Sequence, residues 1–113
     1  MNNLIWLLPI ALVVFLWWRA QGASMASLQA LVARGAQRVD VRNPGEFAAG
    51  HAPGTVNIPL GELEGRLGEL DAQRPVILCC ASGSRSAMAA SMLKAKGFEA
   101  VNAGPWARLQ GLS

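Results

Sequence analysis

The stretch PVILCCASGSRSAMAASMLK, residues 75–94, places an apolar run directly before a loop of small residues and a helical pattern. The run from Pro75 to Cys79 predicts a short, fully buried strand. The pattern from Ala87 to Lys94 predicts a helix. The residues of this helix that we expect to face inward are Met88, Met92 and Leu93. A buried strand that turns directly into a helix is typical of α/β folds with a parallel sheet.

The loop between these two elements opens onto the N-terminus of the predicted helix. In such a turn, successive backbone N–H groups point at one spot, where the helix dipole and Arg85 also favour negative charge. A thiolate at this spot would be stabilised, and its pKa would fall from about 8.5 to roughly 3.5–7.5. Cys80, the first residue of the loop, is therefore the candidate nucleophile.

The other loop residues have different expected roles. Gly83 allows the backbone to turn towards the anion without a Cβ in the way. Arg85 either ties the loop together or faces an anionic substrate, and the serine hydroxyls either donate to the bound sulfur or cap the helix. The expected binding loop consists of Ala81, Ser82, Gly83, Ser84, Arg85 and Ser86. Cys79 should point the opposite way, into packing, because side chains alternate along a strand.

This loop resembles the active-site loop of the rhodanese (sulfurtransferase) family, which begins at a cysteine, closes at an arginine and leads into a helix. Further segments are similar to that family in the same order along the chain. They are Val39-Asp40-Val41-Arg42 with Glu46-Phe47, then Gly50 to Pro59, then Lys96-Gly97-Phe98 with Val101 to Trp106. The resemblance covers about residues 25–110. One departure is Gly104-Pro105, where the family more often has two glycines.

The resemblance implies sulfur transfer by covalent catalysis. Cys80 would take the outer sulfur of thiosulfate or of a low-molecular-weight persulfide, and a thiol, a protein or cyanide would accept it. No cofactor is required. The resemblance also implies that Asp40 and Arg42 support the loop structurally, and His51 is expected to be a hydrogen-bonded structural residue rather than a base.

Two alternative functions share these features. Cysteine phosphatases and arsenate reductases use a similar anion cradle with five residues between cysteine and arginine, whereas only four residues separate Cys80 from Arg85. The shorter loop forms a smaller anion-binding site, which suits a sulfur atom better than a tetrahedral oxyanion. The other alternative is a catalytically inactive rhodanese-like module that docks or regulates a partner at the membrane.

Strands and helices are expected to alternate through the rest of the chain. The first expected helix is 28–34, which Ser27 caps and Gly35 stops, and a helical turn follows at 46–49. A further helix runs through Leu60, Leu63 and Leu67, with an interruption at Gly65, and a final helical turn carries Trp106. The expected strands are 39–42, 55–57 and 99–101. This alternation predicts a small parallel sheet covered by helices on both faces. Ligands of such sheets bind beyond the carboxyl ends of the strands, where the Cys80 loop lies.

The amino-acid composition argues against nucleic-acid binding, a structural disulfide and a metal site. The 113 residues carry a net charge of only +3, and the basic residues are scattered, so we expect no nucleic-acid partner. Cys79 and Cys80 are the only cysteines and are adjacent, so they cannot form a structural disulfide between separate elements. With His51 as the only histidine, no metal site is expected. A reactive thiolate fits a reducing compartment.

The N-terminal segment has a different character. No charged side chain occurs before Arg19, and every residue from Leu4 to Trp18 is apolar apart from Pro9. The segment from Asn2 to Ala20 would form about 28 Å of helix, close to the roughly 30 Å of a hydrocarbon core. We therefore expect a transmembrane helix over residues 1–20, a linker over 21–26 and the rhodanese-like domain over 27–113.

Two other interpretations compete with a transmembrane helix. Ala20-Gln21-Gly22 would serve as a cleavage site of a signal peptide, although no basic residue precedes the apolar run. A helix lying in the membrane interface would need a polar face, which this segment lacks. For a single-pass anchor, Arg19, Arg34 and Arg38 on the C-terminal side predict a catalytic domain that faces the cytoplasm.

Overall fold

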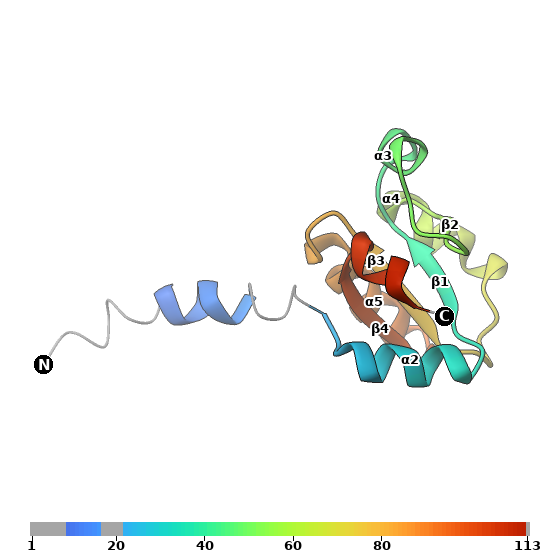
Figure 1. Ribbon diagram of the computed structural model, residues 1–113, viewed down its shortest axis with the longest axis horizontal. Coiled ribbons are helices and arrows are strands. Elements are labelled where there is room, and N and C mark those ends of the chain that lie inside the picture. The colour runs from blue at the N-terminus through green and yellow to red at the C-terminus, as the bar shows by residue number, and fades with distance from the viewer. Residues whose placement is uncertain (1–8, 17–21, 113) are drawn as a thin grey trace, which may run out of the picture.

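A parallel sheet lies between two layers of helices in the computed structural model, which describes residues 9–16 and 22–112 (Figure 1). The four strands are β1 (Gln37–Asp40), β2 (Val56–Asn57), β3 (Val76–Cys80) and β4 (Ala100–Pro105). Their order is β2-β1-β3-β4, and every neighbouring pair is parallel. The predicted α/β class and the small parallel sheet are confirmed.

Helices cover both faces of the sheet, as predicted. One face packs against α4 (Leu60–Leu63), the 3-10 helix η1 (Glu64–Glu69) and α5 (Ser84–Ala95). The other packs against α2 (Met25–Ala33) and the 3-10 helix η2 (Trp106–Gly111). The short helix α3 (Pro44–Ala49) follows β1.

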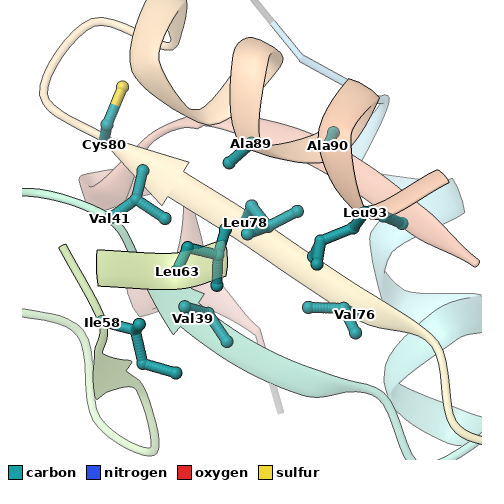
Figure 2. Close-up of a cluster of buried hydrophobic side chains, with 11 residues drawn as sticks. Val39, Val41, Ile58, Leu63, Val76, Leu78, Cys80, Ala89, Ala90 and Leu93 are labelled. Carbon is teal, nitrogen blue, oxygen red and sulfur yellow. The ribbon is translucent and has the colours of Figure 1, made fainter. Parts of the chain in front are cut away.

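The central strand β3 is buried along its whole length and divides the two cores. Val76, Leu78 and Cys80 belong to the core beneath α4 and α5 (Figure 2). Ile77 and Cys79 belong to the core beneath α2 and η2. The alternation of side chains therefore turns the two cysteines to opposite faces, as expected.

Helix α2 begins earlier than predicted. Its N-cap is Ser24 rather than Ser27, because the Ser24 hydroxyl accepts a hydrogen bond from the Ser27 backbone N–H at 3.2 Å. The residues before the cap lie against the sheet edge, where the Ala23 N–H donates to the Asn102 carbonyl at 2.8 Å. Gly22 has a φ of +88° and a backbone so close to Ala103 that a side chain would collide with it.

Two further predictions were wrong in detail. Met88 on α5 is 65% exposed, whereas Leu93 is buried and Met92 packs against the core as predicted; the other buried residues of the inward face are Ser86, Ala89 and Ala90. Small residues let this helix approach the sheet closely. Strand β4 extends beyond the predicted 99–101. The expected turn at Gly104 is instead part of the strand, because a bulge between the partners of Leu78 and Cys79 allows the strand pairing to continue.

Part of the predicted membrane segment lies outside the described residues, namely 1–8 and 17–21. Residues 9–16 form a helix whose exposed apolar side chains are Ile10, Leu12, Val13, Val14, Phe15 and Leu16. Within the part of the chain that the structure describes, no helix has the length and apolar character needed to cross a bilayer.

Candidate active site

Cys80 ends the central strand, and its sulfur lies beside the loop that leads into α5 (Figure 2). Three donors surround Sγ: the Gly83 N–H at 3.0 Å, the Ser86 N–H at 3.4 Å and the Ser86 hydroxyl at 3.3 Å. The loop bends back over the sulfur because Gly83 adopts a left-handed conformation with φ +101°. The structure thus brings Cys80, Gly83 and Ser86 together, as the loop pattern suggested.

These donors oppose the effect of burial on the thiol. Burial raises the pKa of Cys80, but hydrogen bonds from the Ser86 hydroxyl and from the N–H groups of Ser86 and Gly83, together with a smaller contribution from the Ser82 N–H, outweigh it and lower the pKa below its ordinary value. Cys79 is in the opposite situation, since burial, followed by the nearby Asp40 carboxylate, strongly raises the pKa of its thiol. The environment therefore favours Cys80 as the nucleophile.

Asn102 on strand β4 forms hydrogen bonds with the Cys80 loop. The Asn102 side-chain amide donates to the Gly83 carbonyl at 3.1 Å, and Asn102 Oδ1 lies 2.7 Å from Ser86 Oγ. The bulge in β4 places Gly104 so that its N–H also donates to Asn102 Oδ1, at 2.9 Å. The contacts of Asn102 thus fix both the turn at Gly83 and the serine that faces the sulfur.

Arg85 forms a two-pronged ion pair with Glu46. Its Nη1 lies 2.8 Å from Glu46 Oε1 and its Nη2 lies 3.1 Å from Oε2. Glu46 belongs to α3, so this pair links the helix after β1 to the helix after β3. Of the two roles expected for Arg85, the geometry matches the one in which it ties the loop to the surrounding structure.

Asp40 and Arg42 form a buried ion pair at the end of β1, with 2.8 Å between Arg42 Nη2 and Asp40 Oδ2. Arg42 also donates to the Gly50 carbonyl at 2.6 Å, and its guanidinium lies 4.7 Å from the centre of the Trp106 ring. These contacts join β1 to the turn at Gly50 and to η2. They are structural contacts of the kind that the resemblance implied.

The remaining predicted residues lie at the rim of the loop or beside it. Ala81, Ser82 and Ser84 are exposed, and the Ser82 and Ser84 hydroxyls lie 3.2 Å apart. His51 Nδ1 lies 2.9 Å from the Phe47 carbonyl, and the two rings stack with their centres 3.8 Å apart. His51 therefore has the hydrogen-bonded structural setting that we expected.

Sequence reasoning missed the contributions of Glu46 and Asn102 to this site. Asn43 and Glu46 have the spacing of a capping box, which the structure contains, but a capping box does not reveal a partner 39 residues away. Asn102 is a polar residue in a strand that packs against the core. The sequence indicates that such a residue needs a hydrogen-bond partner, but it does not identify the partner.

The fold and the loop define a class of protein: an α/β domain with a cysteine held by the N–H groups of a loop at the carboxyl ends of the strands of a parallel sheet. The rhodanese-like domain matches residues 24–103, and the chain belongs to this family. The family expectation from the sequence is therefore confirmed.

Individual relatives agree with this assignment. The chain is 36% identical over 73 residues to the thiosulfate sulfurtransferase GlpE of Pseudomonas syringae, covering 65% of this chain and 69% of that protein. It is 45% identical over 64 residues to the uncharacterized protein YqhL of Bacillus subtilis, covering 57% of this chain and 51% of YqhL. The chain thus spans only about half the length of that relative.

A solved structure shares the fold over nearly its whole length. The human single-domain sulfurtransferase TSTD1 superimposes with a TM-score of 0.63 at 29% identity, covering 82% of this chain and 98% of that one.

Proposed function

We propose that this protein is a sulfurtransferase that carries sulfane sulfur on Cys80, from thiosulfate or a persulfide donor to a thiol, a protein or cyanide. The observation that carries the proposal is the set of three donors around Cys80 Sγ, from Gly83 N, Ser86 N and Ser86 Oγ. Such donors stabilise a persulfide anion as an oxyanion hole stabilises oxygen, by about 3 kcal/mol for each well-placed donor.

The reaction has two displacement steps. The Cys80 thiolate attacks the outer sulfur of the donor, so that a new S–S bond forms while the donor's S–S bond breaks. The electron pair of the broken bond leaves with the donor's thiolate, or with sulfite when thiosulfate is the donor. An acceptor thiolate or cyanide then attacks the terminal sulfur of the Cys80 persulfide, and the Cys80 thiolate is released.

Two assays separate this function from its alternatives. A sulfurtransferase forms thiocyanate from thiosulfate and cyanide, a cysteine phosphatase hydrolyses an aryl phosphate, and a docking module does neither. We expect the purified full-length chain to form thiocyanate and Cys80→Ser to form none. Hydrolysis of p-nitrophenyl phosphate that depends on Cys80, without thiocyanate, would overturn the proposal.

Loop size offers a second test against the phosphatase alternative. One glycine inserted between Gly83 and Ser84 gives the spacing of the phosphatase-like cradle and moves N–H groups away from the sulfur. We expect this variant to lose thiocyanate formation, and unchanged turnover would mean that loop size does not set the chemistry.

The proposal includes a membrane anchor with the domain on the cytoplasmic side. The uncharged, apolar sequence before Arg19 and the exposed apolar side chains of residues 9–16 support the anchor. Arg19, Arg34 and Arg38 support the orientation, because basic residues remain on the cytoplasmic side.

Thiol labelling in intact cells tests this topology. In a Cys79→Ala variant, Cys80 is the single cysteine, and a membrane-impermeant thiol reagent should modify it only after the cells are lysed. Ready labelling in intact cells would place the domain outside and support a cleaved signal peptide instead.

A further inference from the structure

The only arginine of the Cys80 loop is already engaged by a carboxylate. Both terminal nitrogens of Arg85 bond to Glu46, one to each carboxylate oxygen. Both side chains are about one-third exposed, at 33% and 36%, so the ion pair lies at the surface of the site rather than beneath it. Arg85 is also close enough to Cys80 for the thiolate to contribute to the raised pKa of the guanidinium, after the larger effect of Glu46.

Glu46 is held in place independently of Arg85. It is the third residue of α3, and its Oε1 accepts a hydrogen bond from the Asn43 N–H at 3.1 Å in the capping box. The hydrogen bond from Arg85, followed by that from Asn43, lowers the pKa of Glu46 to about 2. The carboxylate is therefore charged at every physiological pH, and it offsets the charge of Arg85 permanently.

Arg42, just after the end of β1, is also paired with a carboxylate. Arg42 pairs with the buried carboxylate of Asp40 at 2.8 Å. Within the Cys80 loop, attraction of an anionic donor thus depends on backbone N–H groups, and two of these, from Gly83 and Ser86, already contact Cys80 Sγ. A donor that brings two negative charges to this thiolate meets repulsion that no unpaired charge of Arg85 or Arg42 offsets.

We propose that Glu46 is a specificity-determining residue, which by neutralising Arg85 makes the Cys80 site select persulfides and other donors of at most one negative charge over the thiosulfate dianion. This inference rests on the proposed sulfur transfer. With a persulfide, R–S–S⁻, the Sγ–S bond forms as the R–S bond to the outer sulfur breaks, and the electron pair leaves with R–S⁻. The thiosulfate reaction is the same displacement with sulfite as the leaving group, so these two donors differ in leaving group as well as in charge.

Two donors of similar shape isolate the effect of charge. Thiosulfate carries two negative charges, and methanethiosulfonate replaces one charged oxygen with a methyl group and carries one. We compare kcat/KM for both donors in the full-length chain, in Glu46→Gln and in Glu99→Gln. Glutamine keeps an acceptor for the Asn43 N–H but removes the charge. Glu99 is the matched control, since it forms the same two-pronged pair with Arg34. Glu99 lies just before the amino end of β4, whereas Cys80 lies at the carboxyl end of β3.

We expect Glu46→Gln to raise kcat/KM for thiosulfate relative to methanethiosulfonate about tenfold, mainly through a lower KM, and to make the thiosulfate reaction more sensitive to salt. Glu99→Gln should leave the ratio unchanged. An unchanged ratio in a Glu46→Gln protein with a wild-type melting curve would overturn the inference.

Alkylation of Cys80 gives a readout that does not require sulfur transfer. The ratio of the rates with anionic iodoacetate and neutral iodoacetamide should rise in Glu46→Gln and stay constant in Glu99→Gln. Should no variant form thiocyanate from either donor, the proposed function fails, whereas the alkylation ratio still decides whether Glu46 controls the charge of the site. A constant alkylation ratio in both variants would refute the role of Glu46 even in an active enzyme.

Discussion

Asn102 Oδ1 lies 2.7 Å from the hydroxyl of Ser86, so strand β4 holds the residue that faces the candidate nucleophile. The same hydroxyl lies 3.3 Å from Cys80 Sγ and 3.2 Å from the Gly83 carbonyl. A serine hydroxyl has a single hydrogen, which these three acceptors must share. When Cys80 is ionised, the negative sulfur becomes the strongest competitor for that hydrogen, and the arrangement favours the thiolate.

Replacing Ser86 with alanine should raise the pKa of Cys80, because the hydroxyl whose hydrogen bond does most to oppose the effect of burial is lost. A lowered pKa keeps the thiol ionised until the pH falls below that pKa. In Ser86→Ala, the fall in reactivity should therefore begin at higher pH. The measurement is the rate of iodoacetamide alkylation against pH, and a profile that does not move, or moves to lower pH, would contradict the role of this hydroxyl.

Removing the Asn102 side chain should destabilise the domain by about 1–3 kcal/mol, because the Gly83 carbonyl and the Ser86 hydroxyl both lose a partner. Urea denaturation of Asn102→Ala measures this loss in the free energy of unfolding. Lys94→Ala, an exposed change on α5, serves as the control and should lie within about 0.5 kcal/mol of wild type. Equal midpoints for both variants would show that Asn102 is dispensable to the fold.

Replacing Asp40 with asparagine should cost about 3–5 kcal/mol, because it leaves the buried guanidinium of Arg42 without a counter-charge. The same denaturation experiment measures the change. Glu99→Gln breaks an exposed pair and should have little effect. A stability of Asp40→Asn close to that of the control would mean that the Asp40–Arg42 pair does not support the domain.

The start of the domain can be located by two truncations. Removal of residues 1–21 keeps the Ala23 contacts with Asn102 and Arg108, as well as the Ser24 cap of α2. Removal of residues 1–24 eliminates all of them and should lower the free energy of unfolding by about 1–3 kcal/mol relative to the shorter truncation. Identical stabilities would show that the edge contacts of Ala23 contribute nothing.

Local sequence patterns predicted the features of the fold that depend on the periodicity of side chains along a strand and on the order of strands and helices along the chain. The buried run before Cys80 and the alternation of Cys79 and Cys80 follow from the two-residue period of a strand. The inward face of α5 did not follow, because hydrophobicity favoured Met88 whereas close packing on the sheet selected Ala89 and Ala90.

The support of the candidate site depends on contacts between distant residues. Glu46 and Arg85 are 39 residues apart, and Ser86 and Asn102 are 16 apart. No local period connects these residues, and only the order of the parallel strands brings them together. The bulge in β4, which positions Gly104 against Asn102, likewise has no signature in the hydrophobic pattern.

The central claim is that Cys80 carries the transferred sulfur, and intact mass spectrometry tests it most directly. After treatment with a persulfide donor or thiosulfate and removal of the excess, we expect wild type and Cys79→Ala to gain the mass of one sulfur atom and to lose it on addition of cyanide. Cys80→Ser should gain nothing. A gain of sulfur by Cys80→Ser that disappears in Cys79→Ala would assign the chemistry to the other cysteine, and no gain in a folded wild-type protein with Cys80 reduced would contradict sulfur transfer altogether.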